Sequence, residues 1–132
     1  MRWQLSGALR AKLRDTLLDQ FPSMRAMISG RNTAIVAPNQ WLAVNYAMWL
    51  RAVGLTIPQD ISIVGFDNFL LLRPTSVSTV VMALADVGYA SAHIFLGDVP
   101  VKTDRWGNVY RPPTFLDRGS IGPPRRSHRR LV

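Results

Sequence analysis

Two stretches decide the fold of this chain: Thr-Ala-Ile-Val-Ala-Pro-Asn-Gln-Trp-Leu-Ala-Val (33–44) and Gly-Leu-Thr-Ile-Pro-Gln-Asp-Ile-Ser-Ile-Val-Gly-Phe-Asp (54–67). Each contains a short apolar run, 33–37 and 61–66, that predicts a strand, and residues 41–53 between them have the length of a helix. A strand, a helix and a second strand in this order predict two parallel strands. Because both runs are continuously apolar, we expect both strands to be covered on both faces.

Polar residues follow the two predicted strands. Asn39 stands two residues after the first apolar run, and Asp67 stands directly after the second. Ligands of open α/β sheets bind outside the carboxyl ends of the strands, so Asn39 and Asp67 are expected to face one crevice. The alternative is that Asn39 only caps the helix that follows it and that Asp67 only caps a turn. Spacing alone does not choose between these two interpretations.

The remaining pattern extends the same architecture. Residues 5–21 have the apolar spacing of an amphipathic helix, 77–81 and 114–118 predict strands, and 84–96 predict a second long helix that ends at Gly97. We therefore predict an α/β fold, a three-layer sandwich in which helices flank a mostly parallel sheet. Residues 41–53 are apolar on nearly all sides, which indicates a second buried contact besides the sheet, and a partner subunit is the natural candidate.

The composition indicates a globular protein. The chain has 132 residues, of which 48% are hydrophobic and 18% charged, and it has no cysteine. No apolar run approaches the ~20 residues that span a bilayer. Residues 1–4 do not begin a secretion signal. We expect a cytoplasmic protein with no membrane partner.

The net charge of +8 is concentrated at one end. Arg125, Arg126, Arg129 and Arg130 lie in the last eight residues, so 125–132 is predicted to be a disordered basic tail after a domain spanning 1–124. Enzyme chemistry has little support. His93 and His128 have no partners at metal-ligand spacing, and no Gly-x-Ser-x-Gly elbow or phosphate-binding glycine loop is present. We expect no catalysis, no metal and no cofactor.

Four motifs carry a family resemblance. These are Pro-Asn-Gln-Trp-Leu-Ala (38–43), residues 54–68, Val-Ser-Thr-Val (77–80) and Asp-Arg-Gly-Ser-Ile-Gly-Pro-Pro (117–124). Their order resembles the C-terminal lobe of the sensor region of LacI/GalR transcriptional regulators, in register over 33–124 and only loosely over 1–32. The resemblance implies one lobe of a periplasmic-binding-protein-like effector domain. A full-length regulator adds a second lobe around a sugar or nucleobase and a DNA-binding head, both of which this chain is expected to lack.

The resemblance also assigns residues. Its effector-contacting Asn and Asp fall on Asn39 and Asp67, and a carboxylate and an amide together can hold a polyol. Gln40 stands where the family usually has Asp, and Met82 where it often has Gln, which changes the expected effector; Trp3 is a candidate for the stacking aromatic. In the family, the helix after the Asn motif and the segment after Gly-Phe-Asp contribute to subunit pairing. We therefore expect a homodimer through Val44, Met48, Trp49, Leu71 and Thr75.

Two other functions are compatible with the sequence. The basic tail indicates nucleic-acid binding, although its arginines are not interleaved with aromatics. A solute-binding protein for transport is the other, and the missing secretion signal argues against it. Our first hypothesis is the sensing and dimerisation part of a transcriptional regulator, which reaches DNA only through a head domain.

Overall fold

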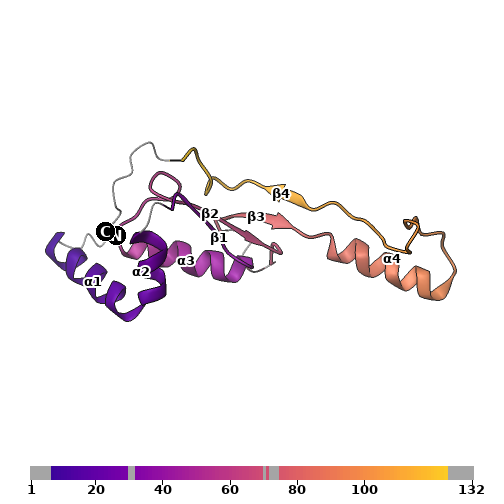
Figure 1. Cartoon of the computed structure of the whole chain (residues 1–132), viewed down its shortest axis with the longest axis horizontal. Coiled ribbons are helices and arrows are strands. Elements are labelled where there is room, and N and C mark those ends of the chain that lie inside the picture. The colour runs from indigo at the N-terminus through magenta and orange to yellow at the C-terminus, as the bar shows by residue number, and fades with distance from the viewer. Residues whose placement is uncertain (1–6, 30–31, 70, 72–74, 125–132) are drawn as a thin grey trace.

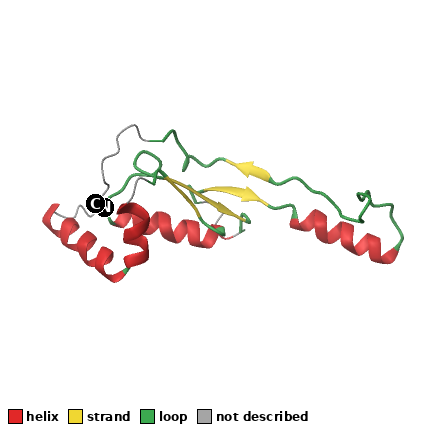
Figure 2. Cartoon of the chain, in the orientation of Figure 1, coloured by secondary structure: helices red, strands yellow, loops and turns green. Residues whose placement is uncertain are grey.

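A mixed β-sheet with flanking helices forms the body of this α/β protein (Figures 1 and 2). The computed structural model describes residues 7–29, 32–69, 71 and 75–124. The elements are α1 (Gly7–Gln20), α2 (Pro22–Ser29), β1 (Ala34–Val36), α3 (Gln40–Ala52), β2 (Ser62–Phe66), β3 (Ser78–Val81), α4 (Leu84–Leu96) and β4 (Thr114–Leu116). No helix within these ranges is long and apolar enough to cross a membrane.

The sheet has the order β1-β2-β3-β4. The β1–β2 and β2–β3 pairs are parallel, and the β3–β4 pair is antiparallel, which confirms the predicted mostly parallel sheet. Strand β2 lies between two neighbours and is largely buried. The expectation that both apolar runs are covered on both faces is wrong for β1, where Val36 is 68% exposed. Strand β1 is an edge strand, and its apolar sequence does not reveal that position.

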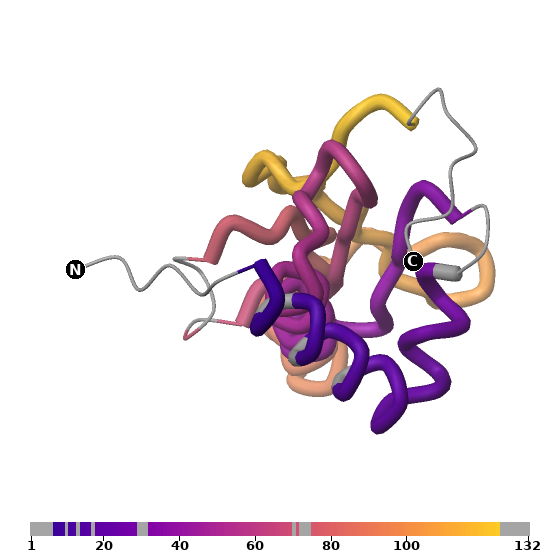
Figure 3. Tube along the Cα trace, turned by 90° about the vertical axis from the view of Figure 1, so that its left-hand side faces the viewer, coloured from indigo at the N-terminus to yellow at the C-terminus, as the bar shows by residue number. Residues whose placement is uncertain are grey.

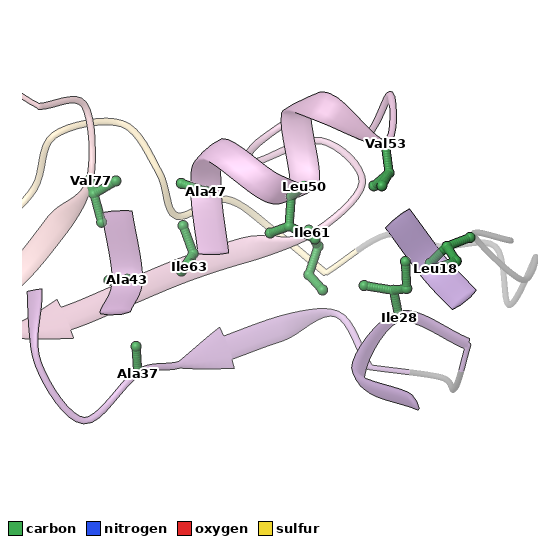
Figure 4. Packing of buried hydrophobic residues seen from close by; sticks show 10 residues of the cluster. All are labelled: Leu18, Ile28, Ala37, Ala43, Ala47, Leu50, Val53, Ile61, Ile63 and Val77. Atoms are coloured by element: carbon green, nitrogen blue, oxygen red, sulfur yellow. The ribbon is translucent and has the colours of Figure 1, made fainter. Parts of the chain in front are cut away.

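Helix α3 packs directly on β2 (Figure 4). Ala43, Ala47 and Leu50 lie on its buried face, and Ile61 and Ile63 meet them from the strand. A Cβ atom at Gly65 would lie 2.8 Å from Ala43 Cβ, 2.9 Å from Gln40 Cα and 3.0 Å from Asn39 O. The first turn of α3 therefore rests on the backbone of β2 at a distance that only glycine permits.

Helices α1 and α2 form a pair that covers one end of the core. Helix α2 begins at Pro22 and contacts α1. Leu18 from α1 and Ile28 from α2 are buried in the core cluster with Val53 (Figure 4). In a view along the long axis, α1 lies nearest the viewer, at the end of the molecule that carries α1, α2 and α3 (Figure 3).

Residues 82–113 form an arm that leaves the sheet. The chain departs after β3, runs through α4 and a loop, and returns to the sheet at β4 (Figures 1 and 2). Of the 13 residues of α4, only Ala90 is buried. Phe95 is 90% exposed, and Leu84, Ile94 and Leu96 are exposed as well. The helical periodicity was sufficient to predict α4, but this helix does not cover the sheet.

A polar network ties residues 117–122 to the strands. Ser120 Oγ donates to Ile63 O at 2.6 Å and accepts from Ser78 N at 2.7 Å. Ser78 Oγ donates to Asp117 Oδ1 at 3.0 Å, and the same carboxylate oxygen accepts from Gly119 N at 2.8 Å. Ser78 and Ser120 are buried. These bonds satisfy polar groups that would otherwise be costly to bury.

Gly65→Ala tests the close packing of α3 on β2. The added methyl must displace the backbone of the first helical turn, so we expect a loss of about 1–3 kcal/mol in the free energy of unfolding, measured by urea denaturation. Gly88→Ala is the matched control, because nothing lies within 4 Å of a Cβ at Gly88 and helix interiors favour alanine. Equal stability of Gly65→Ala and the parent chain would show that α3 sits farther from β2.

Asp117 predicts a pH dependence of stability. The N–H of Gly119 lowers the pKa of the Asp117 carboxyl below its ordinary value, and the Ser78 hydroxyl and the N–H of Arg118 act in the same direction. This carboxylate therefore stabilises the fold fully above its unfolded pKa of about 4, and the contribution disappears as the pH falls through its lower folded pKa.

Asp117→Asn should be less stable than the parent chain at pH 7, and the difference should shrink between pH 4 and pH 2 in urea unfolding series. Asp86→Asn, in the exposed first turn of α4, controls for the loss of one negative charge. A difference for Asp117→Asn that stays constant over this pH range would contradict the assigned role of the carboxylate.

Candidate binding site at the carboxyl edge of the sheet

The carboxyl ends of β1, β2 and β3 meet at one edge of the sheet, because these three strands are parallel neighbours. Asn39, Asp67 and Met82 follow the three strands in turn. Ala37 N donates to Val64 O at 2.9 Å, and Asp67 N donates to Val80 O at 2.9 Å. Neighbouring strands lie about 4.8 Å apart. The structure therefore brings Asn39, Asp67 and Met82 to the same edge of the sheet, whereas their contact with an effector stays a prediction.

Asn39 is the N-cap of α3. Its Oδ1 accepts a hydrogen bond from Leu42 N at 2.9 Å, and its backbone is extended, as at most N-caps. The residue is half-buried. Asn39 therefore does cap the helix. This capping bond uses only the side-chain oxygen. The amide nitrogen of Asn39 keeps two N–H donors for a solute.

Asp67 and Asn68 form a left-handed turn at the end of β2. Their φ angles are 83° and 53°, and neither residue is glycine. Two successive side-chain-bearing residues in this region cost free energy, of order 1 kcal/mol or more each, and such conformations cluster at functional sites. The turn directs the chain away from β2 immediately after the Asp67 carboxylate is placed at the edge. Both residues are half-buried.

The other three predicted effector contacts have different fates. Met82 is 43% exposed at the end of β3, so its thioether is available to a solute. Gln40, the first residue of α3, is completely buried. A side chain with no exposed surface does not contact a solute, and the structure corrects the prediction for Gln40. Trp3 lies outside the described residues.

The predicted dimer residues divide into two groups. Met48 is 63% and Leu71 89% exposed, whereas Val44 and Thr75 are half-buried. Trp49 packs inward, against a small apolar gap lined by α2, β1 and α3 that includes Met27 and Ile28. The apolar surface of α3 that was assigned to a partner subunit is therefore covered in part by α2. Among the predicted dimer residues on α3, Met48 is the one whose apolar side chain is mostly exposed.

A contact between Arg118 and the residue after Asp67 was not predicted from the sequence. Arg118 Nη2 donates to Asn68 Oδ1 at 2.6 Å, and Arg118 Nη1 donates to Val77 O at 3.3 Å. Both residues belong to motifs of the family resemblance, but a contact across 50 positions of sequence leaves no local pattern. The only signal was Arg118 next to Asp117 at the end of a predicted strand, and that signal is weak.

The arm carries a hollow in its loop. It has a volume of about 290 Å³ and is lined by Lys102, Thr103, Asp104, Asn108, Tyr110 and Arg111. Asp104 closes this loop by accepting from Trp106 N at 2.9 Å and Asn108 N at 2.8 Å. Neither Asn39 nor Asp67 lines this hollow. Among the residues that the structure describes, no group of three metal-ligating side chains occurs. The basic tail 125–132 falls outside them.

Comparison with known proteins identifies relatives of this lobe. Residues 3–121 match the family model of the periplasmic binding protein-like domain. The arabinose metabolism transcriptional repressor of Geobacillus stearothermophilus is 32% identical over 93 residues, which are 68% of this chain and 26% of that protein. The ribose operon repressor of Haemophilus influenzae is 30% identical over 95 residues, 70% of this chain and 29% of that protein.

A solved structure of a LacI-family regulator has the same fold as this chain. The chain superimposes on a LacI-family transcriptional regulatory protein from Corynebacterium glutamicum with a TM-score of 0.57 and 25% identity, covering 88% of this chain and 42% of that one. The chain thus spans less than a third of the repressors named above and less than half of this structure. The relatives named here are transcriptional regulators, not enzymes. The chain belongs to the periplasmic binding protein-like family and corresponds to part of the effector domain of LacI-family regulators.

Proposed function

We propose that this chain is the C-terminal lobe of an effector sensor in a bacterial transcriptional regulator, and that it holds a sugar or a similar polyol against the carboxyl edge of its sheet. The observation that carries the proposal is the strained turn that ends β2 with Asp67 at this edge, beside Asn39. The Asp67 carboxylate can accept from two adjacent hydroxyls, while the Asn39 amide donates to a third. Met82 supplies an apolar contact for the carbon face of a ring.

The effector cleft needs a second wall, and the exposed apolar side chains of the arm indicate where a second lobe would pack. Each large apolar side chain of α4 gains about 1.5–3 kcal/mol when it is removed from water, yet Leu84, Ile94, Phe95 and Leu96 are exposed. The relatives are more than twice as long as the matched segment. We propose that α4 packs into the second lobe of the sensor. The two connections of the arm to the sheet would then join the lobes beside the effector.

The solvent-facing side of α3 supports a homodimer. Trp41 is 59% exposed, and Met48, two turns further along, is 63% exposed. Leu71, in the segment that follows β2, adds a third exposed apolar side chain. We propose that this surface, with Val44 and Thr75 at its margin, pairs two copies of the lobe in the cytoplasm. Contact with DNA would be made by a separate head domain.

Sugar binding is predicted to shift a confined set of backbone amides in heteronuclear NMR spectra. Ribose and arabinose come first in the panel because two relatives are named for these pentoses, and hypoxanthine represents nucleobases. Since one wall of the cleft is present, we expect millimolar affinity, with shifts at Asn39, Asp67 and their neighbours. No shift with any panel member at 50–100 mM, on the order of several such dissociation constants, would contradict binding at this edge.

Two variants separate loss of a contact from loss of the fold. Asp67→Gly removes the carboxylate and places at φ 83° the residue that best tolerates it, so the fold is retained and binding should be lost. Asn39→Asp preserves the N-cap, because Asp and Asn cap equally well, but removes the amide donor and should weaken binding about tenfold. Unchanged binding in both variants would exclude these residues as contacts.

Met48→Glu should convert a dimer into a monomer. A carboxylate at the centre of a pairing surface must be desolvated, which costs several kcal/mol. Leu96→Glu is the matched control, because Leu96 on α4 is also 63% exposed but lies outside the proposed surface. Sedimentation equilibrium on the parent chain and both variants checks the assignment. A Met48→Glu variant that remains dimeric, or a parent chain that is monomeric at 100 µM or about that level, would refute pairing through α3.

A further inference from the structure

Arg118 connects the end of β4 with the end of β2. It follows β4 by two residues, and its backbone N–H donates to Ser78 Oγ at 2.9 Å. Its guanidinium donates to Val77 O at 3.3 Å and to Asn68 Oδ1 at 2.6 Å. The residue is half-buried. Its side chain therefore links Val77, the residue before β3, to the left-handed turn.

The turn that Arg118 touches needs external support. Asp67 and Asn68 adopt φ angles of 83° and 53°, a left-handed region that Asp and Asn enter more readily than other side-chain-bearing residues but that still costs free energy unless surrounding bonds favour it. On the side of Asp67, the support is the bond from Asp67 N to Val80 O. On the side of Asn68, it is the charge-assisted bond from Arg118. Charged donors form the stronger class of hydrogen bonds.

We propose that Arg118 is a positioning residue for the effector site. By holding the Asn68 side chain, it fixes the left-handed turn and with it the direction of the Asp67 carboxylate, without touching the solute. The part of this inference that concerns a polyol rests on the proposed function. The part that concerns the turn does not.

Amide hydrogen exchange at Asp67 tests the inference without any ligand. Arg118→Lys keeps the charge and the aliphatic stem but loses the planar fork that reaches two acceptors at once. We expect the Asp67 amide, which is bonded to Val80 O, to exchange about tenfold faster in this variant. The amides of Ala37, bonded to Val64 O, and of Ser62, bonded to Thr33 O, should keep their rates.

Asn68→Gly provides the second arm of a double-mutant cycle. Glycine accepts the left-handed backbone but offers no side chain to Arg118, so adding Arg118→Lys should cause no further change at Asp67. Arg25→Lys is the matched control, because Arg25 donates to Asp19 Oδ1 at 3.2 Å between α2 and α1 and has no bond to the turn. The proposal is overturned if Arg118→Lys leaves the Asp67 amide unchanged, or if its effect is the same in the Asn68→Gly background.

The pentose titration supplies the functional readout. In Arg118→Lys, the dissociation constant for a sugar that the parent chain binds should rise about tenfold while the thermal midpoint changes little. Unchanged affinity despite faster exchange at Asp67 would refute the functional part of the inference. If the parent chain binds no sugar, the proposed function fails, whereas the exchange cycle still decides whether Arg118 holds the turn.

Discussion

The contact between α3 and β2 at Gly65 is the constraint on which the rest of the lobe depends. A helix that approaches a strand this closely cannot rotate or slide without breaking contact along its whole buried face, from Ala43 to Leu50. The same contact places the backbone of the N-cap Asn39 against Gly65, one residue before the end of β2. Hydrophobic packing and the geometry of the polar edge therefore have one origin, and neither can change without the other.

The polar network at the other side of β2 complements this packing. Buried serines usually weaken a core unless every hydroxyl has a partner. Here the hydroxyls of Ser78 and Ser120 donate to Asp117 Oδ1 and Ile63 O, and the Ser78 hydroxyl accepts from the N–H groups of Arg118 and Ser120. The final segment of the domain is thus bound to the two central strands by directional bonds. Apolar contacts fix the position of α3, and hydrogen bonds fix the position of residues 117–122.

Much of the fold was predictable because the deciding signals are local. Continuous apolar runs and the Asn39 cap are sufficient to predict β1, α3 and β2 and the edge at which Asn39 and Asp67 meet. What covers each apolar surface was not predictable. The composition of α3 does not distinguish α2 from a partner subunit, that of β1 does not reveal an edge strand, and the burial of Gln40 depends on how close the helix lies to the strand. The bond between Arg118 and Asn68 spans 50 positions and has no periodicity to mark it.

The route of the chain through the arm has a consequence for signalling. The polypeptide leaves the sheet beside Met82, and when it returns through β4 it reaches Arg118 two residues later. Any displacement of the arm is therefore applied close to the residue that holds the Asp67 turn, and a solute that tightens this turn acts back on the arm with the same coupling free energy. In such a lobe, movement of α4 and binding at the edge of the sheet are coupled through the two ends of the arm.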